Sequence, residues 1–170
     1  MKMKQQTLIL IKPDGMVKSL TGNILSILSE SKFKIVGAKL IRVKKELAEK
    51  HYERHKGKHF YEELIKYLTG DLHFHTNRVF ALVYEGENAI DKIRDLVGNK
   101  NPEDADPKTI RGKYGRINSK TGVFENVVHA SDTIEEAERE IKLWFSPGEL
   151  ANTLYPTKRI KMEKEELIWN

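Results

Sequence analysis

Residues 7–11 read Thr-Leu-Ile-Leu-Ile, and residues 12–15 read Lys-Pro-Asp-Gly. A short run of apolar and β-branched residues that ends at turn-forming residues predicts a buried strand followed by a turn. A second run of this kind, Val79–Tyr84, has no charged position and is expected to be a central strand of the same sheet.

Helical and extended patterns alternate along the rest of the chain. Helices are expected from Thr21 to Leu28, over Glu46–Lys56 and Phe60–Leu68, from Asn88 to Val97, and from a capping box at Thr133 to Phe145; further strands are expected over Lys34–Lys44 and Phe124–His129. Alternation in the first of these strands puts Val36, Ala38 and Leu40 on one face, with a bulge beyond Leu40. Asn99–Gly122 is expected to be a long polar connection.

This order of elements predicts an α/β fold of the α+β type, a ferredoxin-like split βαβ sandwich in which helices cover a four-stranded antiparallel sheet. The 170 residues suffice for one domain, expected over 1–150, with a C-terminal extension over 151–170. Hydrophobic residues make up 39% and charged residues 32%, which excludes a disordered chain. No run approaches the roughly 18 apolar residues of a membrane span, and the chain has no cysteine and no signal-peptide pattern. A cytoplasmic protein without membrane contact is expected.

The segment Asn126–Asp132, Asn-Val-Val-His-Ala-Ser-Asp, places His129 where a strand ends and a capped helix begins. Side chains at strand ends border clefts, and imidazole is a good nucleophile near neutral pH. Glu140 follows eleven residues later, at the margin of the apolar stripe of the next helix, where its carboxylate could accept a hydrogen bond from the imidazole. Taken singly, each residue has a simpler structural explanation: His129 as a capping or core-edge histidine, and Glu140 as a glutamate on the solvent side of the helix.

Two other segments carry chemistry that binds phosphate. Lys12 follows the first strand and precedes a proline turn, which could present its ammonium group to an anion, although the P-loop pattern is absent. The segment Lys108–Arg116 has four basic residues and two glycines in nine positions. Arginine forks bind phosphate oxygens, and glycines allow close approach of the backbone. The alternative explanation is an ordinary turn at Lys12 and a solvated basic loop at Lys108–Arg116.

Three histidines, His51, His55 and His59, are spaced by four residues, a spacing that can chelate a transition metal on a helix. Gly57 interrupts the helix before His59, and no carboxylate completes a recognisable motif. No protein-held metal is therefore expected.

Together these segments resemble the nucleoside diphosphate kinase family. Asn126–Asp132 with Glu140 is similar to the active-site signature of that family, Asn-x-x-His-Gly-Ser-Asp, and Leu10–Gly15 is similar to its N-terminal strand and turn. The other matching positions, in the family order, are His51, Tyr52, Phe60, Arg94, Gly98 and Thr109–Gly112. The resemblance covers about residues 5–150.

The resemblance implies a ping-pong reaction, in which a nucleoside triphosphate gives its γ-phosphate to His129 and a nucleoside diphosphate then takes it up. Glu140 would orient the imidazole, and Tyr52 would donate to the transferring phosphoryl group or steady His129. The remaining implied roles are phosphate binding by Lys12, Arg94, Lys100 and Arg111, binding of the sugar hydroxyl by Asn126, and stacking on the base by Phe60. Mg²⁺ would arrive with the nucleotide.

Several positions depart from the family pattern. Ala130 replaces a glycine, and its methyl group could crowd the phosphohistidine unless the local φ is negative. Lys100 replaces a threonine and keeps a hydrogen-bond donor, while His59 replaces a proline. Two insertions, near 71–77 and 116–122, and an unusual tail leave the assembly open: a homo-oligomer is expected, as a hexamer, tetramer or dimer.

Two other functions stay open: a basic nucleic-acid-binding or regulatory module of the same fold without turnover, and a phosphohistidine carrier that donates to proteins. The first is disfavoured because the sequence keeps Lys12, Tyr52, Arg94, Arg111, Asn126, His129 and Glu140, so nucleic acid is not the expected partner. The net charge of +5 is also unevenly distributed: residues 107–124 hold five basic residues and no acidic one, and residues 50–60 hold four basic and one acidic. The rest of the chain is slightly acidic, which indicates a small polyanionic ligand.

Overall fold

The computed structural model describes residues 3–72 and 74–161. The main strands are β1 (Lys4–Ile11), β2 (Lys34–Arg42), β3 (Arg78–Glu87) and β6 (Val128–Ala130), and β4 (Arg116–Ile117) pairs with β5 (Phe124–Glu125) in a small hairpin. The α-helices are α1 (Pro13–Val17), α2 (Thr21–Ser29), α3 (Lys45–His51), α4 (Tyr61–Thr69), α5 (Ala89–Val97), α6 (Ile110–Tyr114) and α7 (Ile134–Trp144), and 3-10 turns span Glu53–His55, Pro102–Asp104 and Pro147–Glu149. Within these described ranges, no helix has the length and apolar character needed to cross a membrane.

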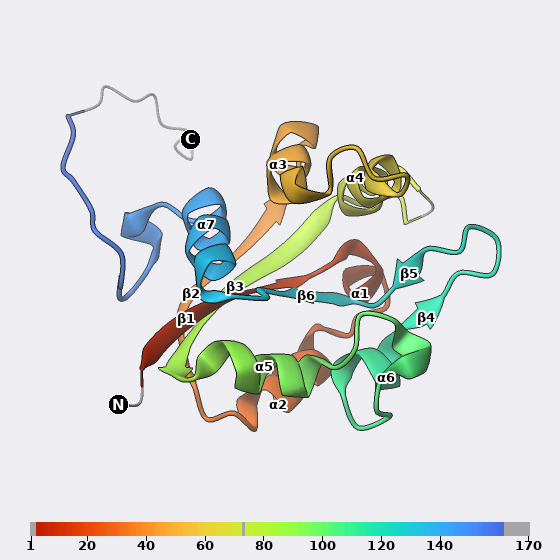
Figure 1. The fold of residues 1–170 in the computed structure, drawn as a ribbon, viewed down its shortest axis with the longest axis horizontal. Coiled ribbons are helices and arrows are strands. Elements are labelled where there is room, and N and C mark those ends of the chain that lie inside the picture. The colour runs from red at the N-terminus through yellow and green to blue at the C-terminus, as the bar shows by residue number, and fades with distance from the viewer. Residues whose placement is uncertain (1–2, 73, 162–170) are drawn as a thin grey trace, which may run out of the picture.

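The four main strands form one antiparallel sheet in the order β2-β3-β1-β6. β1 pairs with β3 along its whole length and with β6 on its other edge, where Leu10 lies opposite His129. Helices cover both faces of the sheet (Figure 1): α3, α4 and α7 lie on one face, and α2, α5 and α6 on the other. The predicted four-stranded antiparallel sheet covered by helices is confirmed.

Two hydrophobic cores explain the apolar run of β1. Leu8 and Leu10 pack with α3, α4 and α7, whereas Ile9 and Ile11 pack with α2 and α5 on the opposite face. All four side chains are fully buried, and each such burial stabilises the fold by about 2 kcal/mol. A strand with a helical layer on each side needs apolar residues at every position, which is why this segment does not alternate.

The predicted facing of β2 is wrong. Val36 is buried, but Ala38 is exposed and Leu40 is 56% exposed. The pairing register with β3 shifts at Val36, so the bulge lies there and not beyond Leu40. Because one inserted residue moves every later side chain to the opposite face, Val43 points into the core and Leu40 does not.

Two segments predicted as irregular are helical. The turn predicted at Lys12–Gly15 is wrong, because α1 begins at Pro13, the helical position at which a missing N–H has no cost. The connection predicted over Asn99–Gly122 contains a 3-10 turn, α6 and β4. At the start of α6, the Thr109 hydroxyl accepts from the N–H of Gly112 and caps the helix.

Two further predictions of helix and strand bounds are wrong, and one helix start is confirmed. The helix predicted over Glu46–Lys56 ends at His51, where a 3-10 turn follows. The strand predicted over Phe124–His129 is interrupted between β5 and β6. The N-cap at Thr133 is confirmed, because its hydroxyl accepts from the N–H of Glu136 at 3.2 Å.

The chain after α7 is attached to the sheet. The N–H of Ala151 donates to the carbonyl of Val36 at 2.7 Å. The side chain of Asn152 donates to Glu85 at 2.6 Å, and Gln6 donates to the same carboxylate oxygen at 2.9 Å. The first residues of the expected C-terminal extension therefore contact the domain, and the boundary at residue 150 stays a prediction.

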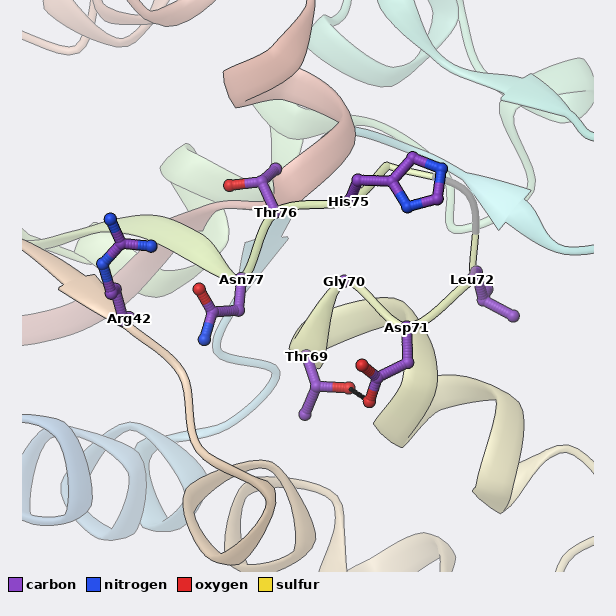
Figure 2. Close-up of a pocket in the computed structure, with 8 residues that line it drawn as sticks. All are labelled: Arg42, Thr69, Gly70, Asp71, Leu72, His75, Thr76 and Asn77. Atoms are coloured by element: carbon purple, nitrogen blue, oxygen red, sulfur yellow. Dashed lines mark hydrogen bonds between the residues drawn. The ribbon is translucent and has the colours of Figure 1, made fainter.

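Between α4 and β3, where an insertion near 71–77 is predicted, residues 69–72 and 75–77 border a polar hollow of about 490 Å³ (Figure 2). Gly70 turns the chain into this loop with a φ of 78°, and a Cβ there would lie 1.9 Å from the carbonyl oxygen of Thr76. Only glycine fits such a position. None of the residues that line the hollow is among the predicted site residues.

Candidate active site

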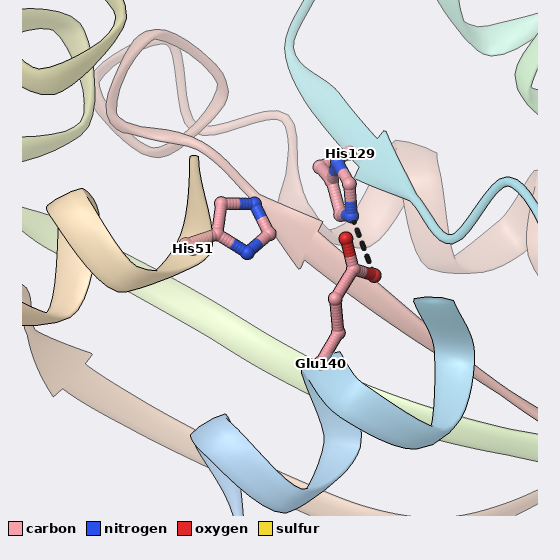
Figure 3. A group of neighbouring side chains, drawn as sticks. All are labelled: His51, His129 and Glu140. Atoms are coloured by element: carbon pink, nitrogen blue, oxygen red, sulfur yellow. Dashed lines mark hydrogen bonds and ion pairs between the residues drawn. The ribbon is translucent and has the colours of Figure 1, made fainter. Parts of the chain in front are cut away.

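His129 and Glu140 meet on the face of the sheet that α3 and α7 cover (Figure 3). Val128 and Ala130 belong to the opposite core, so the alternation of β6 turns His129 toward α7. Glu140 lies on α7 beside the buried Ile141 and is only 3% exposed. The His129 Nε2 atom is 2.9 Å from Oε2 of Glu140.

The surroundings of Glu140 keep its carboxylate ionised. Burial by itself would raise the pKa, but the neighbouring His129, His51 and Ser131 together hold the pKa of Glu140 below its ordinary value. The Ser131 hydroxyl donates to Glu140 Oε2 at 2.6 Å and accepts from the N–H of Leu8. An ionised carboxylate only accepts hydrogen bonds, so the hydrogen-bond network assigns the proton of the neutral His129 ring to Nε2. Nδ1 of His129 then carries the free lone pair.

A strained turn at Val127 separates β5 from β6. Its φ is 58°, which β-branched residues rarely adopt. The N–H of Val128 donates to the carbonyl of Asn126 at 2.7 Å, which closes a three-residue turn. Asp14 accepts from the N–H of Val127 at 3.0 Å, and the N–H of Lys12 donates to the Val127 carbonyl at 2.9 Å. These contacts with the start of α1 hold the strained backbone in place, as is typical of functional sites.

Lys12 is a buried cation at the end of β1. Its Nζ donates to Oδ1 of Asn126 and lies 4.3 Å from the ring centre of Tyr67. Burial lowers the pKa of Lys12 to about 7, although the negative charges of Asp14 and Glu125 act in the opposite direction. Because a buried ammonium group is costly to leave without an anion, a phosphate at this position would stabilise it.

Arg111 is held by backbone carbonyls. One terminal nitrogen donates to the carbonyl of Gly98 at 3.0 Å and the other to the carbonyl of Val128 at 3.1 Å. The residue is 8% exposed, and burial lowers its pKa to about 10. Asp132 and Arg94 also influence this pKa, which places Arg111 beside a further charge cluster.

That cluster centres on Asp132, which the sequence analysis did not single out. Arg94 pairs with one carboxylate oxygen of Asp132, and Lys100 donates to the other at 3.2 Å. Two predicted phosphate-binding cations thus share one carboxylate. The backbone carbonyl of Lys100 also accepts from the side-chain amide of Asn126 at 2.7 Å, which joins the cluster to Lys12. The only sequence signal for Asp132 is its place at the end of the Asn126–Asp132 segment.

Tyr52 and Phe60 belong to a row of rings along the segment between α3 and α4. Ring centres lie 6.2 Å apart for Tyr52 and His55, and 5.7 Å apart for His55 and Phe60. Burial raises the pKa of Tyr52, and the charge of Arg111 acts on the same hydroxyl. The two basic segments, 50–60 and 107–124, therefore approach each other at the site.

Residues 5–150 match the family model described as nucleoside diphosphate kinase. The chain belongs to the nucleoside diphosphate kinase family. A nucleoside diphosphate kinase of Pyrococcus furiosus is 47% identical over 146 residues, which cover 86% of each chain. One from Staphylococcus epidermidis is 43% identical over 152 residues, which cover 89% of this chain and 95% of the relative.

Solved structures of nucleoside diphosphate kinases share the fold. A transition-state mimic of the Borrelia burgdorferi enzyme with bound vanadate and ADP superposes with a TM-score of 0.78 at 33% identity, over 89% of this chain and 93% of that one. A Halobacterium salinarum enzyme in complex with CDP has the same TM-score at 37% identity, with the same coverage of both chains. The predicted family, fold and phosphotransferase class are confirmed.

Ala130 replaces the usual glycine of the nucleoside diphosphate kinase signature without crowding the site. It lies in β6 opposite Ile9, and its φ is not positive. Its methyl group belongs to the core on the face opposite His129. We expect Ala130→Gly to lower the free energy of unfolding by about 1 kcal/mol, because glycine weakens a strand interior, and to leave the rate of His129 phosphorylation unchanged. Denaturant titration and a phosphorylation time course check the two parts, and a changed phosphorylation rate would contradict this account.

The structure groups His51 with His129 and Glu140 rather than with His55 and His59. In the described part of the chain, these three residues are the group whose possible metal-ligand atoms all lie within 4.8 Å of one another (Figure 3). The Nδ1 atom of His51 accepts a hydrogen bond from the indole N–H of Trp144 at 3.2 Å. Sequence spacing could not reveal this contact, because 93 residues separate His51 from Trp144.

Proposed function

We propose that this chain transfers the γ-phosphate of nucleoside triphosphates to nucleoside diphosphates through a phosphohistidine on His129. The observation that carries the proposal is the hydrogen bond from His129 Nε2 to Glu140, in a chain of the nucleoside diphosphate kinase family. This bond directs the lone pair of Nδ1 away from Glu140 and makes it available as the nucleophile.

In the first half-reaction, the Nδ1 lone pair of His129 attacks the γ-phosphorus. An N–P bond forms, the bond from the γ-phosphorus to the bridging oxygen breaks, and the nucleoside diphosphate leaves with that electron pair. In the second half-reaction, a terminal β-phosphate oxygen of another diphosphate attacks the phosphohistidine, and Nδ1 recovers its lone pair. Glu140 stabilises the positive charge that develops on the imidazole in each transition state.

The cations around His129 supply positioning and charge stabilisation, which dominate phosphoryl transfer. Lys12 and Arg111 are the buried cations that bind phosphate oxygens. Arg94 and Lys100 release the carboxylate of Asp132 when the nucleotide enters and then bind further phosphate oxygens. Tyr52 donates from its hydroxyl. Asn126 binds the sugar hydroxyl and Phe60 stacks on the base. Neither contact involves the hydrogen-bonding edge of the base, so the site accepts nucleotides with different bases.

Mg²⁺ would enter with the nucleotide, as part of the substrate, and would neutralise part of the charge of its phosphates. We place the enzyme in the cytoplasm, as a homo-oligomer that is a hexamer, tetramer or dimer. Size-exclusion chromatography with light scattering distinguishes the three assemblies.

A single labelling experiment tests the proposed function. Incubation with γ-labelled ATP and Mg²⁺ is expected to give an acid-labile phosphoenzyme, which a diphosphate carrying a base other than adenine then discharges. His129→Ala is expected to take up no label, whereas His75→Ala, at an exposed histidine beside the hollow between α4 and β3, is expected to behave as the parent protein. An unlabelled parent protein would refute the proposal.

The same experiment separates the alternatives. Label that every diphosphate leaves on the protein would favour a carrier that donates to other proteins. Binding to DNA that is steeply salt-dependent and unaffected by His129→Ala, in a protein that takes up no label, would favour a nucleic-acid-binding module.

A further inference from the structure

His51 is a buried titratable group to which the proposed reaction assigns no role. It lies at the end of α3 and is 3% exposed, and its Nε2 atom has no hydrogen-bond partner among the residues that the structure describes. Its ring is edge-on to the ring of His129, with centres 4.5 Å apart and planes at 81° (Figure 3). A buried polar atom without a hydrogen bond is uncommon and calls for a physical explanation.

Trp144 determines which nitrogen of His51 carries the proton. The indole N–H can only donate, so Nδ1 of His51, 3.2 Å away, must be the unprotonated nitrogen. The proton of the neutral ring therefore lies on Nε2, the nitrogen that does not contact Trp144. Metal ligation through Nε2 would require the proton to move to Nδ1, where it would oppose the Trp144 N–H.

The charges around His51 keep it neutral. Burial lowers the pKa of His51 well below the ordinary value. His129, Arg139 and Lys12 lower it further, and Glu140 acts in the opposite direction. A neutral His51 spares His129 a neighbouring positive charge, which would weaken the imidazole as a nucleophile.

The backbone of His51 is also fixed to α7. The guanidinium group of Arg139 donates to the carbonyl of His51 at 3.1 Å and to the carbonyl of Lys50 at 2.9 Å. Arg139 in turn pairs with Glu136 at 3.0 Å, one turn earlier on the same helix. Glu140, Arg139 and Trp144 on α7 therefore hold both His129 and the residue that contacts it.

We propose that His51 is a positioning residue, whose Nε2–H lies against the face of the His129 ring and keeps Nδ1 aimed at the phosphorus. This inference rests on the proposed function. A polar hydrogen directed at an aromatic face is weakly attractive, and its value here is directional, because it resists rotation of an imidazole that Glu140 holds through only one atom. In this site, Trp144 orients His51 and His51 orients His129.

The first test uses the unmodified protein without nucleotide. In ¹⁵N-histidine NMR, His51 is expected to show a proton on Nε2 and none on Nδ1 from pH 6 to pH 8. A charged His51, or a proton on its Nδ1, would overturn the inference. This readout does not depend on catalysis, so it distinguishes the inference from the proposed function, which fails if the protein takes up no phosphate.

The second test uses His51→Phe, which removes the N–H but keeps a ring, and Trp144→Phe, which removes the donor that selects the tautomer together with part of the buried indole ring. Each is expected to slow phosphorylation of His129 at saturating ATP by about tenfold or more, because a small misorientation of Nδ1 relative to the phosphorus lowers the rate strongly. The ATP concentration for half-saturation is expected to stay unchanged. Ile65→Val, in the same hydrophobic core but on α4, controls for loss of packing. Rates equal to those of the control would overturn the inference.

Discussion

Glu140→Gln is expected to slow formation of the phosphoenzyme by about 100-fold or more while the protein stays folded. The ionised carboxylate selects the Nε2–H tautomer of His129 and stabilises the imidazolium charge in the transition state. A neutral amide of similar size can still accept one hydrogen bond but loses that charge stabilisation. The effect should therefore appear in the rate at saturating ATP rather than in nucleotide affinity.

Rapid-quench labelling across ATP concentrations measures this effect, and a melting curve verifies folding. Glu138→Gln is the matched control: it makes the same chemical change on the same helix, at a half-exposed glutamate that pairs with Lys142 on the surface. Unchanged phosphorylation in Glu140→Gln would remove this carboxylate from the reaction.

Binding of a nucleotide at pH 8 is expected to be accompanied by uptake of a proton at Lys12. Burial lowers the pKa of Lys12 to about 7, so most of the free protein has a neutral amine at this pH. Bound phosphates favour the ammonium form and raise the pKa. The kcat/KM for the triphosphate should consequently fall as pH rises through about 7, whereas kcat, which reports the loaded enzyme, should fall less.

Calorimetric titration with a non-hydrolysable triphosphate, in buffers of different ionisation enthalpy, measures the proton uptake. Lys12→Met should abolish this uptake and slow phosphoryl transfer by about 100-fold, since a charge that stabilises the transition state is lost. Uptake that persists in Lys12→Met would assign the proton to another group.

The same pKa has a consequence for stability. In the unfolded chain, the lysine binds its proton up to its ordinary pKa of 10.5, but in the folded protein only up to about 7. Between these values the unfolded state binds more protons, so Lys12 makes the protein more stable as pH rises, and Lys12→Met should remove that contribution.

Much of the fold could be predicted from local patterns. The unbroken apolar runs of β1 and β3 and the apolar stripe of α7 reflect burial that each element experiences along its own length. The facing of β2 could not be predicted in this way, because the bulge at Val36 depends on its pairing with β3. The break between β5 and β6 depends likewise on contacts with α1, which compensate the strain at Val127.

The predicted site residues divide in the same manner. His129, Glu140 and Lys12 were found because an element boundary or a familiar spacing marks them. Asp132 and Trp144 were not assigned to the site and His51 was given no role there, because their importance lies in contacts with residues far apart in the sequence. The alternative explanation of Glu140 as a solvent-side residue is wrong, since its carboxylate is buried against His129.

The amino-acid sequence by itself determined the order of the four main strands and the longer helices, the family, and the chemical types of the groups at the site. Periodicity and short motifs in the sequence specify these properties. Tertiary structure decided the protonation chemistry. Only folding removes Lys12 from water, places the carboxylate of Glu140 on one nitrogen of His129, and directs the Trp144 N–H at His51. A pKa or a tautomer is a property of the surroundings of a group, and those surroundings come from residues far apart in the chain.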